Sequence, residues 1–292
     1  MSTKTAGLYY NDYFYIKEKE ERVGQPCAQC GSCAAGTLCE HAPPMDTPLL
    51  EITGASATIS LRRPEQANRL EPQDLGTLAA HIATVNASPE VLVLRLASTG
   101  RYFCSGFDIG QMDPHKPQAF EELANALEDA RPVTLALLQG GVYGGATDLA
   151  LACDFRLGAV GIDMFMPAAR LGLHFYPRGL QRYVSRLGLD QAKRLFLTAE
   201  RIAAAEMHAI GFLTQLVAPE ARMAEADALT QRLAAMAPLA LLGMKKHLNH
   251  IARGVLDMDA VQHDIARAAH SADLQEGRAA WAEKRAPRFT GT

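Results

Sequence analysis

The sequence of 292 residues lacks an excess of positive charge, because its 29 lysines and arginines stand against 32 aspartates and glutamates. Proteins that bind nucleic acid through its phosphates usually carry such an excess, so we expect no nucleic-acid partner. The sequence also has no apolar run of membrane-spanning length and no continuous apolar stretch of a signal peptide near residue 1. We therefore expect a cytoplasmic protein that does not contact membranes. Hydrophobic content of 48% is typical of a globular protein.

Cysteine is scarce and unevenly distributed. Two of the six cysteines, Cys104 and Cys153, lie in apolar surroundings, where a cytoplasmic protein keeps them buried and reduced. The other four crowd into one short stretch, at Cys27, Cys30, Cys33 and Cys39. Their spacing resembles that of zinc ligands, although it does not reproduce the two separated knuckles of a zinc ribbon. Both a zinc site and a reduced, thiol-bearing segment remain open.

The composition changes near residue 49. Residues 1–48 combine tyrosines, a charged run and the four cysteines, and Pro43, Pro44 and Pro48 lie near their end, which predicts an N-terminal extension that ends in a linker. Strand-like and helix-like patterns then alternate, which predicts an α/β core over residues 49–235 with largely parallel strands. The expected strands lie at 49–61, 91–98 and 132–140, and the expected helices at 72–88 and 120–130. Apolar residues at helical spacing predict a helical region over residues 236–292.

Four glycines and one acid precede an apolar helix in the segment GGVYGGATDLALACD, residues 140–154. Glycine weakens both helices and strands, so a cluster at this junction needs a reason. One explanation is a tight turn from strand to helix. The other is the close approach of a ligand to the N–H groups at the start of the helix.

Five segments together resemble the enoyl-CoA hydratase/isomerase, or crotonase, superfamily. They are RRPEQAN (62–68), RYFCSGFDIGQM (101–112), the glycine segment, LTAERIAAAEMHAIGFLTQLV (197–217) and WAEKRAPRF (281–289). The resemblance begins at about residue 49. It implies a crotonase-like spiral of ββα units with a helical C-terminal trimerisation region, assembled as a homotrimer or a dimer of trimers. It also implies a coenzyme A thioester as substrate and no required cofactor.

The resemblance assigns two backbone N–H groups, those of Phe107 and Gly145, to the thioester oxygen of an acyl-CoA. Amides fixed at the start of a helix stabilise an anionic oxygen, because the peptide dipoles behind them point the same way. This explanation of the glycine segment is stronger than that of a plain turn.

The side chains that hydratases of this family use are only partly present. Asp148 stands at the position of the first catalytic glutamate, and Ala168 at that of the second. Hydration needs a general acid and base, which alanine cannot supply. Asp148 either transfers a proton or complements the helix dipole. His174 is a further candidate for catalysis, although His174 and Tyr176 can equally line a pocket wall or a subunit contact.

The resemblance also indicates how coenzyme A would bind. Backbone groups of Ala67, Asn68, Arg69 and Leu70, together with Arg63, match the family's contacts with the cofactor portion of the substrate. Trp281 and Lys284 match an aromatic residue and a lysine that contact the adenine and the 3′-phosphate from a neighbouring subunit. An aromatic ring stacks on a base and an ammonium pairs with a phosphate, so these residue types fit.

We therefore expect an acyl-CoA enzyme of enoyl-CoA hydratase/isomerase type. Because of Ala168, a decarboxylase or thioesterase of the same fold is the second interpretation. The third is a non-catalytic module that binds coenzyme A or a partner protein.

Overall fold

The computed structural model describes residues 46–111 and 118–292. The cysteine cluster, and with it the predicted zinc site, lies outside these residues. Within the described ranges, no three His, Cys, Asp or Glu side chains are grouped to bind a metal ion. The compact unit begins at Asp46, close to the predicted boundary after residue 48.

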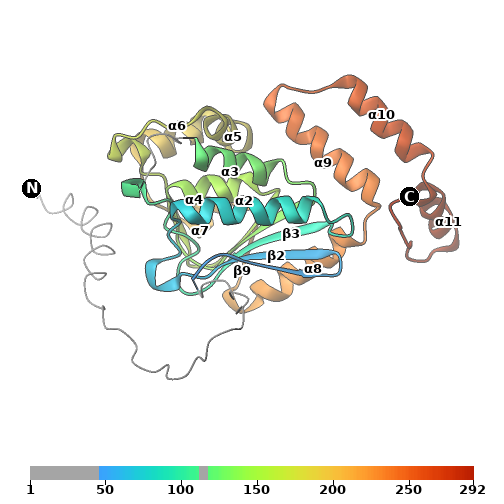
Figure 1. Cartoon of the computed structure of the whole chain (residues 1–292), viewed down its shortest axis with the longest axis horizontal. Coiled ribbons are helices and arrows are strands. Elements are labelled where there is room, and N and C mark those ends of the chain that lie inside the picture. Colours follow the sequence, from blue (N-terminus) through green and yellow to red (C-terminus); the bar gives the residue numbers. More distant parts are fainter. Residues whose placement is uncertain (1–45, 112–117) are drawn as a thin grey trace, which may run out of the picture. The chain divides into compact units, whose positions relative to one another are not determined.

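A six-stranded sheet forms the centre of the unit (Figure 1). Its strand order is β1–β2–β3–β4–β6–β9, and all neighbouring pairs except β1 and β2 are parallel. The strands are β1 (Leu49–Thr53), β2 (Ser56–Leu61), β3 (Val93–Ser98), β4 (Val133–Leu138), β6 (Phe155–Ala159) and β9 (Gln215–Val217). The expected α/β class with largely parallel pairing is confirmed.

Helices connect these strands. A small second sheet lies beside the start of the helix Gly145–Ala152. The helices are α2 (Pro72–Asn86), α3 (Ala119–Glu128), α4 (Gly145–Ala152), α5 (Pro177–Leu187), α6 (Leu189–Thr198), α7 (Ala204–Ala209), α8 (Arg222–Ala234), α9 (Pro238–Arg253), α10 (Met258–Ala269) and α11 (Ala272–Glu283). The second sheet joins β5 (Val142–Tyr143), β7 (Asp163–Phe165) and β8 (Ile202–Ala203). Short 3₁₀ turns lie at 64–66, 109–111, 168–171 and 219–221.

Strand β4 is buried along its whole length, because helices cover both faces of the sheet. Leu135 and Leu137 pack with Ala226 of α8 on one face. Ala136 and Leu138 belong to the large core on the other face, where Figure 1 shows α2, α3 and α4. The continuous apolar run of the sequence is thus the signature of a central strand.

Helix α9 is bound to the rest of the unit mainly by polar side chains. After Leu241 and Leu242, which pack in a small apolar cluster, every fourth residue donates a hydrogen bond to the end of α3 or the chain that follows it. Lys245 donates to the carbonyls of Ala130 and Pro132 and pairs with Asp154 at 2.9 Å. Asn249 donates to the carbonyl of Glu128, and Arg253 pairs with Asp129.

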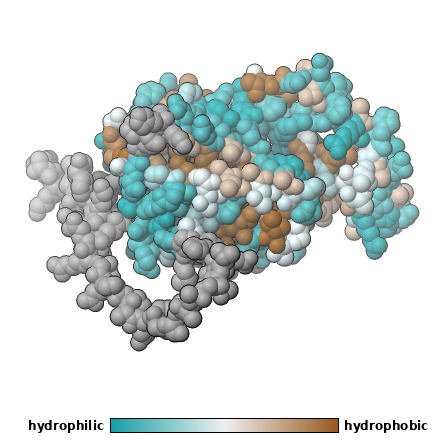
Figure 2. All heavy atoms as spheres, in the orientation of Figure 1, coloured by the Kyte–Doolittle hydropathy of each residue, from teal (hydrophilic) through white to brown (hydrophobic). Residues whose placement is uncertain are grey.

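The opposite side of α9 and the following α10 are apolar and exposed. Met244, Leu248, Ile251, Val255, Met258 and Ile265 all expose more than half of their surface. Figure 2 shows hydrophobic residues gathered near the turn that connects α9 and α10. No helix in the described ranges is both long and apolar enough to cross a membrane.

The polar attachment of α9 predicts a large difference between two neighbouring lysines. Lys245→Ala leaves the carboxylate of Asp154 and two carbonyls without their buried partner, so we expect the free energy of unfolding to fall by about 3 kcal/mol. Lys246→Ala removes only an exposed pair with Asp264 and should cost less than about 1 kcal/mol. Urea denaturation followed by circular dichroism measures both. Equal losses would contradict the buried role of Lys245.

Candidate active site

The glycine segment places the start of α4 against the loop that contains Phe107. Gly106, at φ +100°, has no room for a side chain, because a Cβ there would lie 2.9 Å from the carbonyl oxygen of Tyr143. The same Cβ would lie 3.4 Å from the backbone nitrogen of Gly145. Glycine at 106 therefore allows the loop to close over the first turn of α4, and the two predicted N–H donors become neighbours.

Both predicted donors lack a backbone acceptor within the described part of the chain. Leu70 pairs with the loop by donating to the carbonyl of Gly106 and accepting from the amide of Asp108. That pairing leaves the intervening Phe107 N–H on the opposite side of the loop. The Gly145 N–H lies in the first turn of α4, where helical N–H groups have no partner within the helix. Among the described residues, neither N–H group has a backbone acceptor, and the loop before Phe107 lies against the Gly145 nitrogen.

Aromatic rings surround these donors. A Cβ at Gly145 would lie 2.6 Å from the tip of the Phe120 ring, so this ring covers the glycine directly. The Phe120 ring centroid lies 5.7 Å from that of Phe107 and 6.3 Å from that of Tyr176. An apolar wall of this kind excludes water and strengthens a hydrogen bond from an amide to an anionic oxygen.

Asp148 is fully buried one turn after Gly145, and both of its carboxylate oxygens are bound. Arg182 of α5 donates from Nε to Oδ1 at 3.0 Å and from Nη2 to Oδ2 at 2.9 Å. The Tyr176 hydroxyl donates to Oδ2 at 2.6 Å. These contacts favour the structural interpretation of Asp148, because three charge-assisted hydrogen bonds hold its carboxylate between α4 and α5.

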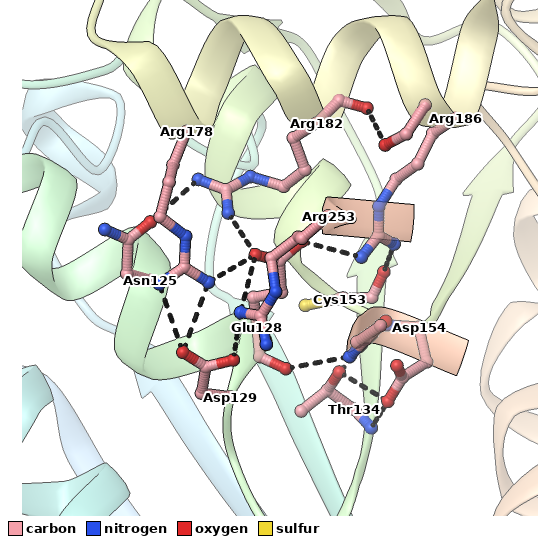
Figure 3. Close-up of polar contacts among 12 residues, drawn as sticks. Asn125, Glu128, Asp129, Thr134, Cys153, Asp154, Arg178, Arg182, Arg186 and Arg253 are labelled. Carbon is pink, nitrogen blue, oxygen red and sulfur yellow. Dashed lines mark hydrogen bonds and ion pairs between the residues drawn. The ribbon is translucent and has the colours of Figure 1, made fainter. Parts of the chain in front are cut away.

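Arg182 in turn belongs to a buried charge cluster built around Glu128 at the end of α3 (Figure 3). Glu128 accepts from Arg178 and Arg182 at 2.7 Å and from Arg186 at 3.2 Å. The three arginines follow one another at intervals of four along α5, so they lie on one face of the helix. Burial alone would raise the pKa of Glu128, but the three guanidinium groups hold that pKa below its ordinary value. The cluster fixes α5 and thereby the guanidinium that binds Asp148.

Sequence reasoning did not identify Arg182 or Phe120 as part of the site. The three arginines of α5, four residues apart, can be seen in the sequence. Their acidic partner Glu128, however, lies 54 residues away from Arg182. Ala168, at the position of the absent second glutamate, is buried in the main core.

His174 is not part of this arrangement in the described residues. Its side chain is exposed, and its Nδ1 lies 2.8 Å from the carbonyl oxygen of Phe175. A catalytic role for His174 stays a prediction without a structural contact to Asp148 or Gly145.

The segment that we expected to bind coenzyme A forms a turn beside the Phe107 loop. Ala67 and Asn68 adopt left-handed backbone conformations, with φ values of 50° and 52°. The buried Asn68 side chain donates to the carbonyls of Thr99 and Tyr102. The amides of Ala67 and Asn68 are bound to carbonyls at 63 and 64 within the turn. This segment is thus a rigid support that joins the Phe107 loop through Leu70.

Arg63 is buried and bound within the same turn. Its guanidinium pairs with Asp74 at 2.7 Å and donates to the carbonyl of Arg69 at 2.9 Å. These contacts indicate a structural role, and they do not support the predicted contact with coenzyme A.

Trp281 and Lys284 lie at the end of α11. Trp281 exposes 87% of its surface, and Lys284 ends the helix in a left-handed conformation. An exposed tryptophan is free to stack on a ligand or on another subunit. The predicted contact with adenine stays untested.

The fold and the order of these elements define a class of crotonase-like proteins, and comparison with known proteins agrees. The family model described as enoyl-CoA hydratase/isomerase matches residues 51–292. The chain therefore belongs to the enoyl-CoA hydratase/isomerase family.

Curated relatives and solved structures are similar over most of their lengths. The (E)-benzylidenesuccinyl-CoA hydratase of Thauera aromatica is 28% identical over 83% of this chain and 98% of its own. The short-chain-enoyl-CoA hydratase of Clostridium acetobutylicum is 28% identical over 69% and 80%. A crystal structure of a putative enoyl-CoA hydratase from Streptomyces coelicolor superimposes with a TM-score of 0.77 at 28% identity, covering 91% of this chain and all of that one.

The buried position of Asp148 predicts a large effect on stability. Asp148→Asn removes the charge that neutralises Arg182, so we expect a loss of about 3–5 kcal/mol in the free energy of unfolding. Asp163 is a matched control, since it also binds one arginine and one tyrosine, Arg201 and Tyr143, but is partly exposed. Asp163→Asn should cost about 1 kcal/mol. Similar losses in chemical denaturation would show that the Asp148 pair is not desolvated.

The depressed pKa of Glu128 predicts a pH-dependent contribution to stability. This contribution is present above the ordinary pKa of 4.5 and is lost as the pH falls through the lower folded-state pKa. Glu128→Gln should therefore be less stable at neutral pH and should lose less stability than the wild type below pH 4.5. Glu65→Gln, a change at an exposed glutamate, serves as control. A Glu128→Gln profile parallel to that of the wild type would contradict this assignment.

Proposed function

We propose that this protein is an acyl-CoA-processing enzyme of enoyl-CoA hydratase/isomerase type that stabilises a thioester enolate with the N–H groups of Phe107 and Gly145. The observation that carries the proposal is the close approach of the Gly106 loop to the start of α4, where neither the Phe107 nor the Gly145 amide has a backbone acceptor among the described residues. Each such donor lowers the barrier by about 3 kcal/mol when water is excluded. The relatives named as hydratases support the same chemistry.

The residues at the family's two glutamate positions favour a second candidate reaction. Asp148 is bound by Arg182 and Tyr176, and Ala168 replaces the second acid of the family. Decarboxylation of a malonyl-type thioester also passes through an enolate and requires no base to activate water. A decarboxylase with the same pair of amides is therefore the alternative to hydration or isomerisation. Thioester hydrolysis and a non-catalytic role in binding remain further outcomes of the test.

We also propose that the exposed apolar side of α9 and α10 forms contacts between copies of the chain. A homotrimer or a dimer of trimers would cover these residues and could bring Trp281 and Lys284 of one subunit to the coenzyme A of another. The exposure of several large apolar side chains on these helices supports this assembly. Location in the cytoplasm stays a prediction from the sequence.

Turnover of a defined set of thioesters tests the proposed reaction. We expect conversion of either crotonyl-CoA or methylmalonyl-CoA by the wild type, with the product identified by mass spectrometry. Water addition would support hydration, and release of CO2 would support the alternative. Binding of all thioesters without conversion would contradict an enzymatic function and favour the binding module.

A pair of variants tests the Gly145 amide itself. Proline is well tolerated at the first position of a helix and lacks an N–H group, so Gly145→Pro deletes the donor. Because a Cβ at this position meets the Phe120 ring, the change is made together with Phe120→Ala. The control combines Phe120→Ala with Gly145→Ala, which keeps the N–H group. We expect kcat of the proline variant to be about 10²–10³ lower than that of its control, and equal values would contradict the proposal.

A further inference from the structure

A polar group outside the family's pair of glutamates, the Tyr176 hydroxyl, is bound to the first turn of α4. The Tyr176 hydroxyl lies 2.6 Å from Oδ2 of Asp148, one helical turn beyond the Gly145 amide. The Tyr176 ring also contacts Phe120, whose own ring covers Gly145. Tyr176 thus lies at the edge of the space in which the thioester would react.

The charges around this hydroxyl are balanced. Asp148 is paired with Arg182 through two hydrogen bonds, and Arg182 is held by Glu128. Tyr176 itself begins α5 as its N-cap residue, and its ring stacks on Phe175 with centroids 4.2 Å apart. The phenol is therefore fixed in position by packing on one side and by an ion pair on the other.

We propose that Tyr176 transfers a proton to the enolate carbon, with Asp148 and Arg182 as the residues that position its hydroxyl. This inference rests on the proposed enolate chemistry. Every reaction considered above that protonates Cα requires a proton donor at this point, and both oxygens of Asp148 are already occupied by hydrogen bonds from Tyr176 and Arg182.

The step balances as follows. The hydroxyl rotates about its Cζ–Oη bond from Asp148 toward Cα of the enolate. Its O–H bond breaks as a C–H bond forms with the enolate electron pair, and the thioester C=O is restored. The tyrosinate then takes a proton from water. It forms beside both members of the ion pair: the charge of Asp148 opposes it and the guanidinium of Arg182 stabilises it.

The same environment keeps the hydroxyl protonated before the reaction. Burial, and after it the charge of Asp148, raise the pKa of Tyr176 well above its ordinary value of 10.0. The site therefore contains a neutral phenol at physiological pH, and it donates a proton to a strongly basic carbanion.

The test is the reaction of crotonyl-CoA in D2O or, if the wild type decarboxylates, of methylmalonyl-CoA. We expect the wild type to incorporate deuterium at Cα in a single configuration, read by NMR and mass spectrometry. Tyr176→Phe should lower kcat by at least about 10²-fold, because general acid catalysis contributes 10²–10⁴-fold, and should give both configurations. Asp148→Asn, which loosens the hydroxyl without removing it, should give a partial mixture.

Tyr183→Phe is the matched control. Tyr183 is a buried tyrosine of α5 whose hydroxyl, like that of Tyr176, binds a residue of α4, but its partner is Thr147. This variant should keep the rate and the single configuration, and thermal denaturation confirms that both tyrosine variants are folded.

The possible outcomes separate the two proposals. If the wild type converts a thioester while Tyr176→Phe keeps its rate and its configuration, the role of Tyr176 is wrong and the proposed function stands. If the wild type converts neither thioester, the enolate chemistry itself is overturned, and the assignment of Tyr176 falls with it.

Discussion

The buried ion pair between Arg182 and Asp148 is the constraint on which the rest of the site depends. It joins the first turn of α4 to α5, and Glu128 extends it to α3. Three helices that belong to different parts of the chain are thereby fixed around the Gly145 amide. A buried pair of this kind gives little net stability compared with apolar packing, but its strict geometry fixes the orientation of the helices.

The pair also bears on the proposed chemistry, because it occupies the carboxylate at the position of the family's first glutamate. A carboxylate at this position acts as a base only if an oxygen is free to accept a proton. Here both oxygens are bound, so proton transfer passes to the neighbouring phenol in our interpretation. The peptide amides need no such adaptation, because they belong to the backbone and persist when side chains change. In the proposed mechanism the backbone donors stay the same while the groups that move protons differ.

Much of the fold could be predicted from the sequence, because it depends on local patterns. The apolar run of β4 predicts a buried strand, and the glycines at 144 and 145 predict an opening at the start of α4. The partners of charged residues could not be predicted in this way. Arg182 and Glu128 are far apart in the sequence, and the acid at 148 offers no local sign of being neutralised. The ion pair of Arg63 with Asp74 could not be predicted for the same reason, since Asp74 belongs to the next helix.

Helix α9 shows where a reading of apolar patterns fails. Its inner side beyond the first turn carries Lys245, Asn249 and Arg253, and its outer side carries Met244, Leu248 and Ile251. A prediction from residue hydrophobicity alone would place the apolar side of this helix inward, which is the opposite of its orientation in the structure. Replacing the exposed apolar residues of α9 by polar ones would therefore leave its attachment intact. Such changes would remove only the apolar surface that another molecule could contact.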